Sequence, residues 1–134
     1  MTTFGNNVYI SRIATMRNIT FYDKNGIPFC YTEDDCHIYD LDGNPSAYID
    51  HNSVWNYEGK HLGFMHKGWI IDHSGKYLLF SDQSTGGPLK PLKALTPLKR
   101  LRSLKPLKRL KELAPLRPLT RLSWSDLTVD EFFV

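Results

Sequence analysis

Short runs of alternating hydrophobic and polar residues fill positions 19–87, and they recur at intervals of 16 or 17 residues. Four glycines mark the recurrence: Gly26, Gly43, Gly59 and Gly75. Three residues before each glycine stands an Asp or Asn, and five residues after it stands an aromatic residue. Four matches in register are hard to obtain by chance. The pattern therefore predicts four copies of one structural unit.

Each unit has the pattern of a β-hairpin. The first arm is rich in β-branched and aromatic residues, as in Ile19–Tyr22, and the second arm alternates. Between them lies a turn such as Asp23-Lys24-Asn25-Gly26. Asp can cap nearby backbone N–H groups, and Gly accepts a positive φ, so we expect a type I turn closed by a glycine bulge.

A single hairpin is marginally stable in water, so the apolar faces of the four units must meet. We therefore predict an all-β domain over residues 19–87, with four hairpins around a pseudo-fourfold axis. Residues 1–18 form an N-terminal extension to this repeat, in which residues 8–13 could add a further strand.

A different period governs residues 88–122, where leucine occupies every third position. The leucines are Leu89, Leu92, Leu95, Leu98, Leu101, Leu104, Leu107, Leu110, Leu113, Leu116, Leu119 and Leu122. In an α-helix they would spiral over every face, and the prolines of the segment would interrupt the helix. A polyproline II helix has three residues per turn and would place all leucines on one side, with Lys and Arg on the other two. Short helices at residues 98–105 and 107–114 are the alternative.

Twelve leucines are a large apolar surface to leave in water, because burial of each contributes about 1.5–3 kcal/mol. A straight arm of this length would span about 110 Å at about 3.1 Å per residue. We therefore expect the arm to bend around its own domain, or to reach another subunit, and to bury its leucines. Residues 123–134 resemble an anchor, because Trp124, Leu127, Phe132 and Phe133 favour burial and Thr128-x-x-Glu131 could cap a helical turn.

The net charge of +3 hides a division of charge along the chain. Residues 88–122 carry eleven bases and one acid, a net +10, whereas residues 1–87 carry −4 and residues 123–134 carry −3. The candidate basic patch comprises Lys90, Lys93, Lys99, Arg100, Arg102, Lys105, Lys108 and Arg109. The opposite charges of arm and repeat domain favour an arm that binds protein, above all its own domain.

Composition excludes several classes of protein. The chain is 41% hydrophobic and 23% charged, which argues against a disordered or collagen-like chain. No apolar run approaches the roughly 18 residues of a membrane helix, and residues 1–17 make a poor signal peptide. We therefore expect a cytoplasmic protein without integral membrane association. Two cysteines do not make a disulfide scaffold.

Candidate chemical sites are weak. Asp40-x-Asp42-Gly43 resembles the start of a calcium loop but lacks the later acidic ligands, so we interpret it as a turn. Zinc could bind Cys30, Cys36 and His37, or His61 with His66, but the spacings match no zinc motif. A Gly-x-Ser-x-Gly elbow is absent from the sequence. Trp55, Trp69 and Phe64 are expected in the core rather than in a ligand cage. We expect no catalytic residue, metal or cofactor.

Three features together resemble the bacterial 4-fold beta flower proteins. These are the four aromatic-Asp-x-x-Gly units, the Gly-Gly-Pro-Leu-Lys-Pro-Leu segment at 86–92 and the Leu-Ser-Trp-Ser segment at 122–125. The resemblance covers residues 19–133. It implies the fold but no activity, because this family is described by its fold and has no assigned catalytic residues.

The sequence favours a non-enzymatic assembly or protein-interaction module, either a homo-oligomer or a binder of another protein. The alternative is an anionic partner, nucleic acid or an acidic membrane surface, bound by the basic arm. Nucleic acid is disfavoured, because the arm offers no aromatic residue to stack on bases.

Overall fold

The computed structural model describes residues 18–134. Its strands are β1 (Ile19–Tyr22), β2 (Pro28–Thr32), β3 (His37–Asp40), β4 (Pro45–Asp50), β5 (Ser53–Trp55), β6 (His61–His66), β7 (Trp69–Ile71) and β8 (Tyr77–Leu79). One short helix, α2 (Val129–Phe132), lies near the C-terminus. The predicted strand at residues 8–13 lies outside the described residues.

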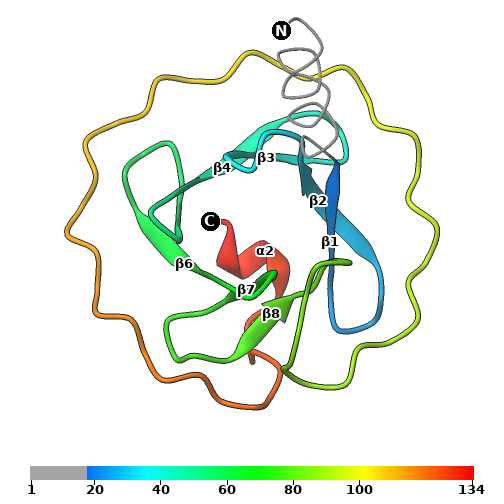
Figure 1. The fold of residues 1–134 in the computed structure, drawn as a ribbon. Helices are drawn as coiled ribbons and strands as arrows, with labels where there is room; N and C mark the ends of the chain where they lie inside the picture. Colours follow the sequence, from blue (N-terminus) through cyan, green and yellow to red (C-terminus); the bar gives the residue numbers. More distant parts are fainter. Residues whose placement is uncertain (1–17) are drawn as a thin grey trace, which may run out of the picture.

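The eight strands form one antiparallel sheet in sequence order, so each strand pairs with its neighbours along the chain. The sheet curls until its first and last strands meet (Figure 1). There, the backbones of Tyr22 and Phe80 exchange two hydrogen bonds of 2.8 and 2.9 Å. The result is a nearly closed barrel of four hairpins, which confirms the prediction of an all-β repeat domain.

The hairpin turns have the predicted chemistry. The Asp or Asn side chain accepts hydrogen bonds from the backbone N–H groups two and four residues later, as Asp23 does from Asn25 and Ile27 at 2.9 and 3.0 Å. Each turn glycine has a φ between 79° and 93°. The register of each hairpin shifts next to its turn, as expected for a glycine bulge.

Side chains alternate between the inside and the outside of the barrel. The hydrophobic core is formed by one set of repeat-related residues: Phe21, Ile38, Val54 and Ile70 from the first arms, and Cys30, Ala47 and Leu79 from the second arms. The next residue along each arm belongs to a separate aromatic layer, which includes Tyr22, Tyr48, Trp55, Phe64 and Phe80. The barrel therefore buries hydrophobic side chains on both faces, and its outer face needs a cover.

The C-terminal helix α2 supplies part of the inner core (Figure 1). Val129 and Phe132 are buried among the barrel residues. Gly63 stands where the other units carry a larger side chain, because a Cβ at Gly63 would meet the Ile71 carbonyl oxygen and the Phe132 ring. The helix begins with the predicted capping box between Thr128 and Glu131.

The residues of the predicted anchor differ in burial. Phe132 is buried and Trp124 and Phe133 are half-buried, but Leu127 remains 42% exposed. The expectation that Leu127 is buried was wrong, because Leu127 precedes the helical turn whose inward face carries Val129 and Phe132.

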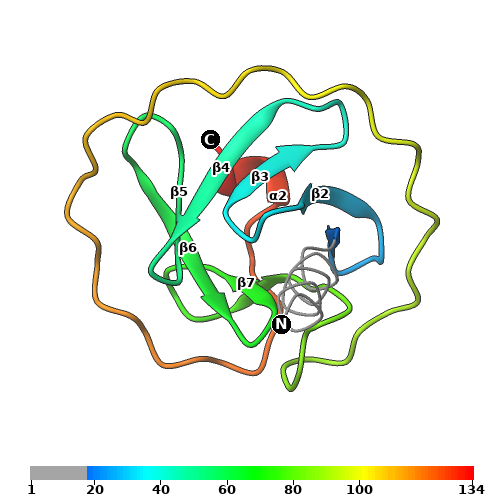
Figure 2. The ribbon, with the colours of Figure 1, turned by 45° about the horizontal axis from the view of Figure 1, so that its top comes forward.

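The outer cover of the barrel is the arm, residues 88–122. Figures 1 and 2 show it as one continuous loop around the barrel. No helix or strand is assigned over residues 88–121, so the short helices considered at 98–105 and 107–114 do not form. Among residues 18–134, no helix has the length and apolar character needed to cross a membrane.

Replacing Phe132 with Ala should destabilise the fold by about 3–5 kcal/mol, because it empties a fully packed position against Gly63. Leu127→Ala is the matched control and should cost less than about 1 kcal/mol, since that side chain is half in solvent. Urea unfolding followed by tryptophan fluorescence measures both. Equal losses of unfolding free energy in the two variants would show that α2 does not stabilise the barrel core.

Candidate functional site

The arm is tied to the barrel at the four hairpin turns. The backbone N–H groups of Ala94, Ser103, Glu112 and Arg121 donate to the carbonyl oxygens of Gly26, Gly43, Gly59 and Gly75, at 2.7–2.9 Å. The four donors are spaced nine residues apart, while the four acceptors are spaced 16 or 17 apart. Each hairpin unit of the barrel, 16 or 17 residues long, therefore corresponds to nine residues of the arm.

The turn glycines serve this contact as well as the turn. A Cβ at Gly26, Gly43, Gly59 or Gly75 would overlap the carbonyl oxygen of an arm leucine, namely Leu92, Leu101, Leu110 or Leu119. Glycine thus allows both the positive φ of the bulge and the close approach of the arm backbone.

The arm is itself a fourfold repeat of nine residues. Its units begin with Pro88, Pro97, Pro106 and Pro115, each followed by Leu and then by Lys or Arg. This repeat was missed in the sequence, although the spacing of these prolines contains it. The leucine period of three and the additional Pro91 and Pro118 conceal it.

One set of arm cations lies over the aromatic layer. Lys99 lies 4.4 Å from the ring centroid of Tyr31, and Lys108 lies 4.5 Å from that of Tyr48. Nine residues further on, Arg117 faces Phe64 at 5.4 Å. These cation–π contacts and the apolar stems of the side chains seal the outer face of the barrel.

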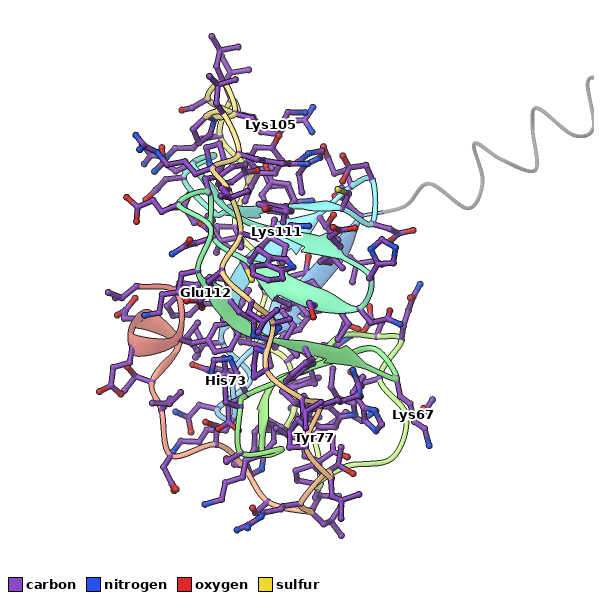
Figure 3. All side chains as sticks on the ribbon, turned by 90° about the vertical axis from the view of Figure 1, so that its left-hand side faces the viewer. Lys67, His73, Tyr77, Lys105, Lys111 and Glu112 are labelled. Atoms are coloured by element: carbon purple, nitrogen blue, oxygen red, sulfur yellow. The ribbon has the colours of Figure 1, made fainter. Side chains whose placement is uncertain are left out.

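A second set combines an aromatic ring with an acid. Lys93, Arg102 and Lys111 lie over the rings of Tyr22, Tyr39 and Trp55 at 5.5, 5.4 and 5.1 Å. The same three cations form ion pairs with Asp82, Glu33 and Asp50, respectively. Figure 3 shows Lys111 on the arm where it crosses the side of the barrel.

The fourth unit departs from this scheme on both sides of the contact. The aromatic position holds Ile71, and the acidic position, seven residues after Gly59, holds His66. The arm position opposite, nine residues after Lys111, holds Thr120 in place of a cation. Where the barrel offers neither ring nor acid, the arm offers no charge. The contacts are therefore matched unit by unit.

Most of the predicted basic patch is occupied by contacts within the chain. Lys90 donates to the carbonyl of Ser84 at 2.8 Å, and Arg100 lies 3.6 Å from a carboxylate oxygen of Asp42. The side chains of Lys105 and Arg109 are exposed.

The twelve leucines point away from the barrel. Eleven of them are 90–96% exposed, and Leu122 is 76% exposed. The expectation that the leucines are buried was wrong for the single chain. Cations take the inward positions because the outer barrel face carries aromatic rings and carboxylates. The leucines form a row along the outer side of the arm, which we call the leucine rim.

A buried histidine lies under the arm. His61 is within hydrogen-bond distance of His73 at 2.8 Å and of the Ser53 hydroxyl at 3.0 Å. Its backbone N–H donates to the carboxylate of Glu112, the one acid of the arm, at 2.8 Å. Burial lowers the pKa of His61 to about 4, and the adjacent His73 contributes to this shift as the second cause. Figure 3 places Glu112 and His73 on the side of the arm toward α2.

The candidate metal ligands serve other roles. Cys30 lies inside the barrel, and burial raises the pKa of its thiol well above the usual range. His66 lies 3.0 Å from Arg117, apart from the His61–His73 pair. Asp40 accepts turn N–H groups from Asp42 and Asn44. Within residues 18–134, no three His, Cys, Asp or Glu side chains are grouped to hold a metal.

Gly43→Ala should release the arm locally, because its Cβ would displace the Leu101 carbonyl and break the bond from Ser103. Loss of about 1.4 kcal/mol raises the open fraction roughly tenfold, so trypsin should cleave near Arg102 that much faster. Gly86→Ala is the matched control, since Gly86 also has a positive φ but has nothing within 4 Å. Equal cleavage rates in both variants would refute the role of close approach.

The free energy of unfolding should fall as the pH drops from about 6.5 to about 4. The unfolded His61 binds a proton near pH 6.5, whereas the folded one resists protonation until about pH 4. The pKa of His66 is also lowered, by burial and by Arg117, and adds to the effect. Urea titrations at several pH values measure it. His61→Gln should remove most of this dependence and His51→Gln, at an exposed turn, should leave it; the reverse would contradict the assignment.

Comparison with known proteins agrees with the repeat architecture. The family model described as 4-fold beta flower protein matches residues 19–133. Neither the curated proteins nor the solved structures include a significant match. The match spans the barrel, the arm and α2, and so the chain belongs to the 4-fold beta flower protein family.

Proposed function

We propose that the protein is a non-enzymatic, cytoplasmic interaction module whose recognition surface is the leucine rim. One observation carries the proposal: twelve leucines at three-residue intervals are exposed, while most of the arm cations are held against the barrel. So many exposed apolar side chains on one side of a segment are typical of a protein-binding site.

The exposed leucines are energetically costly unless a partner covers them. Burial of a leucine side chain contributes about 1.5–3 kcal/mol, so even a quarter of the rim could contribute substantially to binding. Covering the barrel does not require leucine on the outward side of the arm, where polar residues would be enough. We therefore assign the leucines to binding and the inward cations to attachment.

In this proposal the barrel is a scaffold. The four hairpins and the four nine-residue arm units are arranged around a pseudo-fourfold axis, and the arm is a polyproline II chain bent into a ring. Polyproline II leaves backbone groups unpaired, and the four hydrogen bonds to the turn glycines fix its path. The rim is thereby presented in a rigid form, which reduces the entropy lost on binding.

The anionic-partner alternative has less support. Lys93, Arg102 and Lys111 are paired with carboxylates, and Lys99 and Lys108 lie over aromatic rings. A phosphate backbone would have to displace these contacts or rely on Lys105 and Arg109. The apolar part of the outward surface is leucine, which does not attract phosphate.

A photo-crosslinking amino acid in place of Leu104 should form crosslinks to protein in cells that express the full chain. The control carries the same group in place of Lys67, an exposed residue of the turn between β6 and β7. This turn lies on the side away from α2 (Figure 3), and crosslinking there should be several-fold less. Leu101→Ser with Leu107→Ser should reduce the crosslinks from position 104. Equal yields at 104 and 67, or crosslinks to nucleic acid, would overturn the proposal.

A further inference from the structure

We infer that the partner of the leucine rim is a second copy of this chain, and that rims join copies side by side into an extended layer. The inference rests on the proposed interaction function and names its partner. Three properties of the described residues support it: the spacing of the leucines, the inward placement of the charges and the size of each contact.

The spacing of the leucines matches another rim best. At about 3.1 Å per residue, side chains three apart in a polyproline II chain are about 9.3 Å apart. An α-helix repeats every 5.4 Å along its axis, and a strand repeats about every 6.6–6.8 Å on one face. Only a second three-residue repeat keeps its side chains in step with this one, and a second copy provides it.

Part of the charge of the arm is compensated within the chain. The arm carries a net +10, but Lys93, Arg102 and Lys111 form ion pairs with Asp82, Glu33 and Asp50, while Lys105 and Arg109 remain exposed. Eleven of the twelve leucines are 90–96% exposed. Two rims that approach side by side would therefore meet through leucine side chains.

The dimensions favour several neighbours over one. A quarter of the rim is nine residues, or roughly 28 Å at about 3.1 Å per residue, and it is about one side chain wide. A stable pair buries about 800 Å² on each partner, which is well above what such a strip offers. Each contact is therefore weak by itself, and four equivalent quarters allow four contacts to act together.

The polar ends of the barrel weigh against a lipid partner. The end that carries α2 exposes Asp126, Asp130 and Glu131. The turns that join one hairpin to the next expose Asp35 and Lys67. A disc with its rim in a bilayer would have to bury one of these ends in hydrocarbon, where charge is costly. A single foreign globular protein would cover only an arc of the rim and leave the rest exposed.

The test is to block quarters of the rim in the full chain. Leu→Ser at 89, 92 and 95 blocks the first quarter, and the same change at 107, 110 and 113 blocks the opposite one. Sedimentation velocity over a wide range of concentration, with negative-stain microscopy, should show layers for the parent protein. Blocking two opposite quarters should leave linear chains, and blocking all four should leave monomers.

Two controls keep the experiment decisive. Leu→Met at 89, 92 and 95 preserves the apolar rim and should preserve the layers. Near-ultraviolet circular dichroism should be unchanged in every variant, because these leucines do not pack in the barrel core. A parent protein that stays monomeric at all concentrations overturns the inference, as do assemblies that persist with all four quarters blocked. If the parent is monomeric and position 104 crosslinks only a foreign protein, the interaction function stands and this inference fails.

Discussion

The contact between the arm backbone and the four turn glycines is the constraint on which the rest of the structure depends. At each turn one N–H of the arm donates to the glycine carbonyl, and the neighbouring arm carbonyl occupies the space that a Cβ would need. These contacts fix the register of the arm. The register then decides which side chains meet aromatic rings, which meet carboxylates and which face outward.

The arm solves a problem of size. Residues 19–87 are too few to build a thick core, and their strands carry large apolar side chains on both faces. The inner face closes around α2, whereas the outer aromatic layer needs a cover from elsewhere in the chain. Lys and Arg suit this cover, because their stems pack on rings while their charged ends reach the carboxylates of Asp50, Asp82 and Glu33. The barrel and the arm are therefore one folding unit.

The hairpins could be predicted from sequence because their determinants are local. Asp23 and Gly26 act within a single turn, and each of the other three turns repeats them. The orientation of the arm was missed, because it depends on which residues the outer barrel face presents. Tyr31 and Tyr48 directly follow Cys30 and Ala47 of the inner core, so they must point outward. That alternation, applied to the second arms, would have predicted an aromatic layer and hence inward cations. The leucine rim was recognised as a surface of interest, but its exposure follows only once that layer is known.

The two matched periods tie the length of the arm to the number of hairpins. A deletion of three arm residues would keep every leucine outside but would move all later donors away from their glycines. Only a change of nine residues restores the register, and it must be accompanied by a change of one whole hairpin. The number of hairpins in the barrel is thus recorded twice in the chain, once in the turns and once in the length of the arm. A barrel of this design can vary in size only by whole hairpins, each with its nine residues of arm.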